Sequence, residues 1–178
     1  MEKTFKIVDL GNSIVNKKYY DLSIGTSEYR CPESILGSMI NETADIWAAA
    51  CLAFELATGD YLFEPEKGNR FSGKEDHLCQ MMELLGAIPK ILFCKGSNYY
   101  KYFDFRGRLV NIKSYSKWFK LLYSYYRDIF GVLNQKYNWK RRLASDFSQF
   151  LLPMLNYSYI KRSTAAHALK SDWLSSVE

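Results

Sequence analysis

Hydrophobic positions recur at helical spacing in several parts of this chain. The clearest run covers residues 43–59, TADIWAAACLAFELATG, which is apolar almost all round and stops at Gly59. Thr43 is expected to cap the helix, and Asp45 lies in its first turn, where the helix dipole favours a carboxylate. At about 15 residues this helix would be about 22 Å long. That length suits the centre of a core and is too short to cross a bilayer.

The remaining pattern predicts a mostly helical body. A helix is predicted over 74–86, where apolar residues repeat on one side, followed by an irregular stretch over 89–112. An apolar stripe covers 115–137, although Gly131 weakens the case for one unbroken helix. Two more helices are expected around 143–155, ending or kinking at Pro153, and around 163–174. Short strands are expected at 5–8 and 13–15. No repeat or linker divides the chain, which fits one domain.

Composition removes several classes of protein. The net charge of +5 comes from 24 basic and 19 acidic residues in short groups, which argues against direct nucleic-acid binding. The four cysteines show no C-x-x-C spacing and there are only two histidines, so a zinc site or a disulfide framework is not expected. A reducing compartment is the natural inference. There is no signal-peptide pattern and no apolar run long enough for a membrane span.

Two short motifs bracket the segment 9–33. It opens with D-L-G at 9–11 and closes with T-S-E-Y-R-C-P-E at 26–33. Asp-x-Gly alone is common turn chemistry. A D-L-G followed at this interval by T-x-x-Y-R-x-P-E is typical of a protein-kinase activation segment.

Longer motifs sharpen this interpretation. They are DLGN at 9–12, ADIW at 44–47, ACLAFELATGDYLFEP from 50, EDH at 75–77, ELLG at 83–86, KYNW at 136–139, FLLPML at 150–155 and KRSTAA at 161–166. With them the whole chain resembles the C-terminal lobe of eukaryotic protein kinases, and among these the SR-protein kinases. The resemblance implies an α+β, protein-kinase-like fold, present here as the mostly α-helical C-lobe.

The resemblance also divides residues 1–178 into parts. These are an activation segment at 9–33, a central helix at about 43–59, an insert and docking region at about 60–140 and C-terminal helices at about 141–176. It implies roles for single residues as well. Asp9 would hold Mg²⁺ against the phosphates of ATP, because a hard cation prefers carboxylate oxygen. Thr26 would help seat the acceptor hydroxyl. Tyr29 and Arg30 would shape the pocket beyond the acceptor residue.

Three further residues would be structural. The resemblance implies a buried ion pair between Glu33 and Arg162, which would tie the activation segment to the distal helices. Asp45 would anchor the backbone of the catalytic loop.

The helix at 74–86 carries Asp76 and Glu83 about two turns apart on one polar face. From the residues alone this is a solvated face. The resemblance implies instead that both carboxylates, with Asp60 and Lys136, line a groove that binds arginines of Arg-Ser-rich protein substrates. Alternate arginines of an extended peptide recur every ~6.6 Å, a spacing that such carboxylates can serve.

The chain contains no glycine-rich loop, no V-A-x-K lysine and no H-R-D-L-x-x-x-N catalytic loop. We therefore expect the 178-residue chain alone to be inactive, with ATP and Mg²⁺ used only with an N-terminal part. Three hypotheses stay open: part of a serine/threonine kinase, a non-catalytic module that binds Arg-rich peptides, or an RNA-associated protein. For the kinase we expect a monomer when full length, no membrane contact, and a location in cytoplasm and nucleus.

Overall fold

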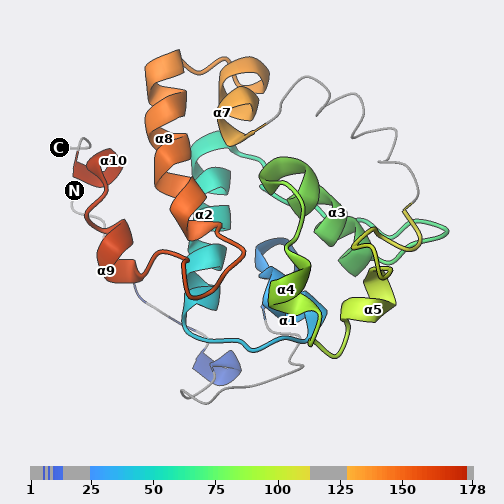
Figure 1. Cartoon of the computed structure of the whole chain (residues 1–178). Coiled ribbons are helices and arrows are strands. Elements are labelled where there is room, and N and C mark those ends of the chain that lie inside the picture. Colours follow the sequence, from blue (N-terminus) through green and yellow to red (C-terminus); the bar gives the residue numbers. More distant parts are fainter. Residues whose placement is uncertain (1–5, 7, 9, 14–24, 113–127, 176–178) are drawn as a thin grey trace.

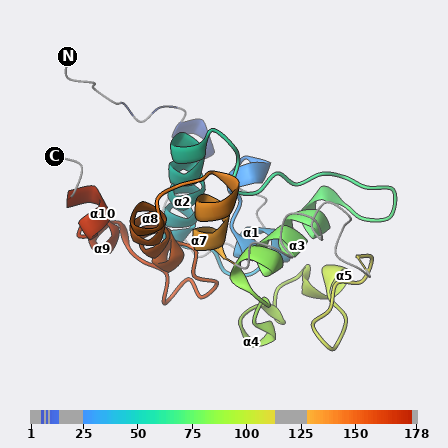
Figure 2. The same cartoon turned by 90° about the horizontal axis from the view of Figure 1, so that it is seen from above.

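The structure is organised around one long helix, α2 (Thr43–Thr58). A computed structural model describes residues 6, 8, 10–13, 25–112 and 128–175. In Figure 1 α2 runs through the middle, with α8 (Arg141–Met154) on one side and α3 (Gly73–Leu85) on the other. Figure 2, seen from above, keeps the same order. The helix ends at Gly59, whose left-handed φ of 84° would strain a residue with a side chain.

The start of α2 corrects one prediction. Thr43 is the first helical residue and is buried, so it is not the cap. The side chain of Asn41 caps the start of the helix instead, because its Oδ1 accepts hydrogen bonds from Thr43 N at 3.1 Å and Thr43 Oγ1 at 2.7 Å. The predicted bounds of 43–59 are otherwise within one residue of the helix.

The core lies where α2, α3 and α8 meet the segments between them. Trp47 of α2 is fully buried, with the rings of Phe63 and Tyr157 stacked on it at 6.0 and 6.3 Å. On the outer side of α8, Trp139, Phe147 and Trp173 form a second aromatic cluster. Burying side chains of this size contributes about 1.5–3 kcal/mol each relative to exposure, which explains why the chain is rich in aromatics.

Beside this core the chain forms short helices. They are α1 (Pro32–Leu36), α4 (Lys90–Phe93), α5 (Tyr99–Tyr102), α7 (Ile129–Gly131), α9 (Ala165–Ala168) and α10 (Asp172–Ser175), with the single turns η1 (Leu10–Asn12) and η2 (Ser27–Tyr29) and the π-helical turn η3 (Val132–Lys136). The stretch 89–112, expected to be irregular, therefore contains α4 and α5. The single helix expected over 163–174 is two helices. Pro153 lies inside the last turn of α8.

Within the described ranges the only β pairing is an isolated bridge between Phe103 and Leu109. Most of the expected strands at 5–8 and 13–15, and residues 115–127 of the stripe expected over 115–137, fall outside these ranges. Beyond the stripe, α7 and η3 replace a continuous helix up to 137.

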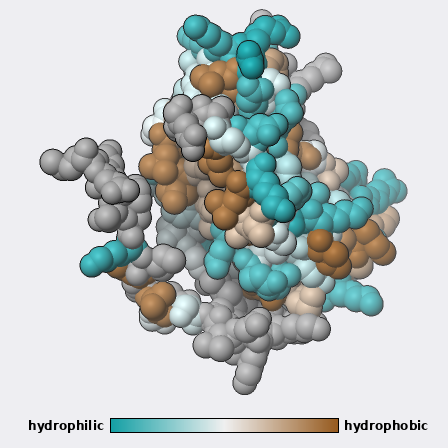
Figure 3. Space-filling model, turned by 90° about the vertical axis from the view of Figure 1, so that its left-hand side faces the viewer, coloured by the Kyte–Doolittle hydropathy of each residue, from teal (hydrophilic) through white to brown (hydrophobic). Residues whose placement is uncertain are grey.

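The face on the left in Figure 1, where α8, α9 and α10 lie, is mixed in character. Figure 3 shows brown apolar patches among teal hydrophilic side chains there. Exposed apolar side chains of this C-terminal part include Leu143, Leu152, Leu169 and Leu174. Among the described helices none is long and apolar enough to span a membrane.

Candidate functional site

The segment 25–36 forms one side of the candidate site. It runs through η2 into α1, which begins at Pro32, a residue pre-organised for the first helical position, and ends at Gly37 with φ 66°. Thr26 precedes η2 and is exposed, and its carbonyl accepts the Tyr29 N–H at 3.2 Å. Thr26 therefore presents a side chain that can donate and accept hydrogen bonds, at an exposed position just before a short turn.

Tyr29 connects this segment to the central helix. Its hydroxyl donates to Glu55 Oε2 of α2 at 2.6 Å, and its ring meets Tyr61 edge-on at 6.1 Å. That hydrogen bond to a carboxylate raises the pKa of Tyr29 to about 12, because loss of the proton would place two anions together. Arg30 folds back, and its guanidinium donates to the Gly25 carbonyl at 2.6 Å. The two residues expected to shape the acceptor pocket are thus both fixed by named contacts.

Beneath this segment lies the pair of Glu33 and Arg162. The guanidinium donates to both carboxylate oxygens, at 2.5 and 2.8 Å, and both side chains are buried. Arg162 also donates to the carbonyls of Thr43 at 3.0 Å and Asn156 at 3.0 Å, and it lies 5.2 Å from the Trp47 ring. These contacts satisfy the buried donors of the guanidinium, as a buried ion pair requires. α1, α2 and the loop after α8 meet at this one pair.

Two predicted residues stand apart from these contacts. Asp45 is exposed in the first turn of α2. Asp9, the predicted Mg²⁺ ligand, lies outside the described residues. The residues that are described bring together no three His, Cys, Asp or Glu side chains that could hold a metal ion.

On the other side of Tyr29, Asp60 and Lys136 are joined directly. Lys136 Nζ lies 2.9 Å from Asp60 Oδ2, and the Tyr137 hydroxyl donates to the same oxygen at 2.5 Å. The hydrogen bond from Tyr137, and then that from Lys136, lowers the pKa of Asp60. Both side chains of the ion pair are partly exposed. An arginine that approached Asp60 would meet a carboxylate that already has a cationic partner.

Asp76 organises the loop that leads into α3. Its Oδ2 accepts the backbone N–H of Glu66 at 3.0 Å and the side-chain amide of Gln80 at 2.7 Å. Gln80 in turn makes two hydrogen bonds to the backbone of Glu64, both at 2.9 Å. These bonds hold the loop 64–66 along α3. Burial raises the pKa of Asp76, which is partly buried.

Glu83 differs most from the expectation that α3 presents a solvated polar face. Both of its carboxylate oxygens are buried and have no hydrogen-bond partner among the described residues. Burial raises the pKa of Glu83 to about 9, so the carboxyl is neutral at pH 7. The shared face predicted for Asp76 and Glu83 is therefore partly covered.

Several site residues escaped the sequence analysis. Glu75, next to Asp76, is buried, and its carboxylate accepts the backbone N–H and the side-chain amide of Asn111 at 2.8 and 2.9 Å. Glu55, the partner of Tyr29, lies in a helix that was predicted from its apolar positions and its ends, and no role was given to Glu55 itself. Both are acids beside or within apolar runs, which was a usable signal for buried partners.

Comparison with known proteins agrees with this geometry. Residues 1–174 match the protein kinase domain family. The chain therefore belongs to the protein kinase family, and its described body is the mostly helical C-lobe of that fold.

The relatives narrow the class further. The chain is 44% identical over 169 residues to the serine/threonine-protein kinase spk-1 of Caenorhabditis elegans, covering 95% of this chain and 16% of that protein. It is 42% identical over 169 residues to SRSF protein kinase 3 of Homo sapiens (95% and 28%). It is 40% identical over 173 residues to the serine/threonine-protein kinase SRPK of Physarum polycephalum (97% and 38%). The resemblance to SR-protein kinases is confirmed, and the chain spans well under half of these relatives' length.

Proposed function

We propose that this chain is the C-terminal part of a serine/threonine protein kinase that transfers the γ-phosphate of ATP, with Mg²⁺, to serines in Arg-Ser-rich proteins. The family match and the names of the relatives support this proposal. Asp9 would contribute a metal ligand when the N-terminal part is present. Thr26, Tyr29 and Arg30 would face the acceptor residue of the substrate. Such a kinase would work as a monomer in cytoplasm and nucleus.

The roles of the fixed residues follow from their contacts. In the proposed kinase, the Glu33–Arg162 pair and the Tyr29–Glu55 hydrogen bond hold the activation segment on the central helix. Asp45, exposed at the start of α2, would anchor the catalytic loop. Positioning accounts for most phosphoryl-transfer catalysis, so rigid support of the acceptor side matters as much as reactive groups.

The observation that carries the substrate class is the alignment of loop 64–66 along α3. Asp76 and Gln80 bind this loop, so that carboxylates from two segments lie on one side of the molecule. Exposed Glu64 and Glu66 lie in this loop beside Asp76. Glu83, which is neutral at pH 7 in the free chain, would pair with an arginine only after the approaching guanidinium lowers its pKa. A guanidinium pairs with carboxylates through two hydrogen bonds, which favours arginine over other cationic groups. Repeated arginines in an extended segment would meet successive carboxylates.

Phosphate transfer tests the catalytic half of the proposal. We expect the purified 178-residue chain to transfer no labelled phosphate from ATP to an Arg-Ser peptide, because the lysine and catalytic-loop motifs are absent from it. Joined to an N-terminal kinase part that carries these motifs, it should transfer phosphate, and Asp9→Ala should abolish that activity. Transfer by the isolated chain, or an unaffected Asp9→Ala protein, would contradict the proposal.

Peptide binding tests the docking half separately. Fluorescence anisotropy with a labelled Arg-Ser repeat peptide should show a loss of affinity of about 3- to 10-fold for Asp76→Asn, and near abolition for Asp76→Ala with Glu83→Ala. Asp104→Asn is the matched control, since Asp104 pairs with Arg108 on an exposed turn outside this region. Equal losses in the control and the docking variants would contradict docking on α3.

A non-catalytic module that binds Arg-rich peptides is the second candidate. The proposed docking residues all lie within this chain, whereas the catalytic-loop motif does not. Binding of the peptide with no activity even after an N-terminal kinase part is supplied would favour this candidate over the kinase.

A further inference from the structure

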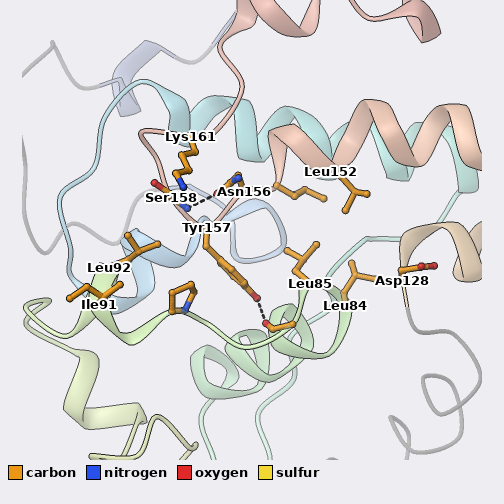
Figure 4. Close-up of a pocket in the computed structure, with 13 residues that line it drawn as sticks. Leu84, Leu85, Ile91, Leu92, Asp128, Leu152, Asn156, Tyr157, Ser158 and Lys161 are labelled. Carbon is orange, nitrogen blue, oxygen red and sulfur yellow. Dashed lines mark hydrogen bonds between the residues drawn. The ribbon is translucent and has the colours of Figure 1, made fainter.

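An open cavity of about 820 Å³ lies between the C-terminal end of α3, α4 and the loop that follows α8. Figure 4 shows its lining side chains converging from these segments. The volume is within the range of pockets that bind small molecules. It lies at the far end of α3 from Asp76 and involves none of the residues assigned to the acceptor or docking surfaces.

Much of the cavity wall is aliphatic, and part of that wall is exposed. Leu84 and Leu85 come from α3, Ile91 and Leu92 from α4, and Leu152 from α8. Ile91 is 86% exposed and Leu152 is 45% exposed. Contiguous apolar side chains left in water around a hollow mark an interaction surface more often than scattered ones do.

The floor is held in place before anything binds. The Tyr157 hydroxyl donates to the Gly86 carbonyl at 2.9 Å, which joins the loop after α8 to the end of α3. Tyr157 is almost fully buried and stacks on Trp47. Asn156 is fixed on both sides, accepting from Ser158 N at its side chain and from Arg162 Nε at its carbonyl. A preformed floor of this kind lowers the ordering cost of binding.

Two charged side chains line the cavity at separate places. In Figure 4 Lys161 lies at the upper edge of the lining and Asp128 at the right. Lys161 is exposed and makes no ion pair with any described residue. Asp128 caps α7 through its Oδ1, which accepts from Gly131 N at 2.7 Å. An occupant with a carboxylate at the Lys161 end would complement this arrangement.

We propose that this cavity binds a short amphipathic helix of a partner protein, with aliphatic side chains against Ile91, Leu92 and Leu152 and a carboxylate at Lys161. The polar lining groups of Asp128, Asn156 and Tyr157 are already hydrogen-bonded within the chain, which leaves few partners for the backbone of a bound peptide. A helix satisfies its own backbone groups, whereas an extended segment would leave them unpaired. The proposal is independent of the kinase assignment and of Arg-rich substrate docking.

Two matched synthetic peptides test the proposal. Each is a fluorescein-labelled helix with leucine at i, i+3, i+4 and i+7, and one carries glutamate in the turn where the other carries lysine. By anisotropy, the chain should bind the glutamate peptide about 3- to 10-fold more tightly. In Lys161→Glu this preference should invert. Binding of neither peptide, or an unchanged preference in Lys161→Glu, would overturn the proposal.

A second variant tests the apolar walls. Ile91→Asp should weaken binding of the glutamate peptide at least about tenfold, and because Ile91 is so exposed the variant should fold normally by circular dichroism. Leu169→Asp, which changes a 73% exposed leucine outside the cavity, should bind as the unmodified chain does. Equal effects of the two variants would overturn the proposal. So would a dimer, seen by sedimentation, that Ile91→Asp dissociates and the peptides do not.

Discussion

Arg162 holds both oxygens of Glu33, 129 residues earlier in the chain, in a pair whose side chains are fully buried. The same guanidinium reaches the backbone at the start of α2 and in the loop after α8. One side chain therefore joins the segment that carries Tyr29 to the two helices that form most of the core. Loss of this arginine would leave a carboxylate buried without a partner.

We expect Arg162→Leu to lower the free energy of unfolding by about 3–5 kcal/mol, because removing one partner of a buried pair leaves an uncompensated charge. Urea unfolding followed by circular dichroism measures this change. The control is Arg142→Ala, which removes an exposed pair with Asp146 at 3.9 Å and should cost less than about 1 kcal/mol. Similar losses in the two variants would contradict a structural role for the buried pair.

A second prediction concerns Lys136 and the binding of Arg-rich peptides. Because it already neutralises Asp60 at 2.9 Å, an incoming arginine must compete with it. We expect Lys136→Met to strengthen binding of an Arg-Ser peptide about threefold, and Asp60→Asn to weaken it by a similar factor. Anisotropy titrations at two salt concentrations measure both, and the differences should shrink as salt rises.

The matched control for Lys136 is Lys170→Met, which removes an exposed cation near the C-terminal helices. It changes the net charge by the same amount. If Lys170→Met strengthens binding as much as Lys136→Met does, the effect arises from overall charge. The hypothesis that Lys136 competes with the peptide for Asp60 would then be wrong.

Local pattern predicted the long helices well and the contacts between them poorly. The bounds of α2 and α3 were within one residue of the prediction, since each has apolar residues at helical spacing and is followed by a glycine. The helix predicted over 163–174 failed because Ser171 starts a new one, its hydroxyl accepting from Trp173 N at 3.3 Å. A serine in a helical pattern is a capping signal in its own right, and here it prevailed over the periodicity.

In the candidate site too, local pattern predicted the positions of residues within one helix but not their contacts with distant parts of the chain. The resemblance to kinases placed Glu33 opposite Arg162 and Asp60 near Lys136, and no periodicity could have done so across 129 or 76 residues. The spacing of Asp76 and Glu83 correctly placed them on one helix. It could not show that Glu83 is covered, because what lies over a helix face comes from other parts of the chain.

His77 makes a prediction for acidic solutions. Burial, with a smaller effect of Arg30, lowers the pKa of His77 from 6.5 to about 3, and its ring packs against Phe63 at 5.2 Å. Below pH 6.5 the His77 imidazole binds a proton in the unfolded chain but not in the folded chain. This residue therefore lowers the stability of the fold as the pH drops from 6.5 toward 3. We expect His77→Phe to remove part of that fall, on the order of a few kcal/mol.

Urea unfolding of the two proteins across this pH range measures the difference. His167→Gln controls for the loss of an imidazole, since it changes the other histidine of the chain, which is exposed. The free energies of unfolding of His77→Phe and the unmodified chain could instead differ by the same amount at pH 7 and pH 4. That result would mean that the substitution acts through packing against Phe63 and that protonation of His77 does not contribute.

Glu83 should act in the opposite direction and over a higher range. Its pKa rises from 4.5 in the usual case to about 9, and the titratable groups that face it are Cys79 and Asp76 on the same helix. Between these values the folded chain holds a proton that the unfolded chain releases. The contribution of Glu83 is therefore complete below pH 4.5 and is lost as the pH rises through 9.

We expect Glu83→Gln, which keeps the shape and cannot ionise, to melt at nearly the same temperature as the unmodified chain at pH 4 and at a higher temperature at pH 9. Thermal unfolding at several pH values measures this growing difference. Asp146→Asn, an exposed carboxylate on α8, is the control and should show no such trend. A constant difference between Glu83→Gln and the unmodified chain would show that the carboxyl is already ionised at neutral pH. In that case the covered face of α3 would have to contain a cation close to Glu83.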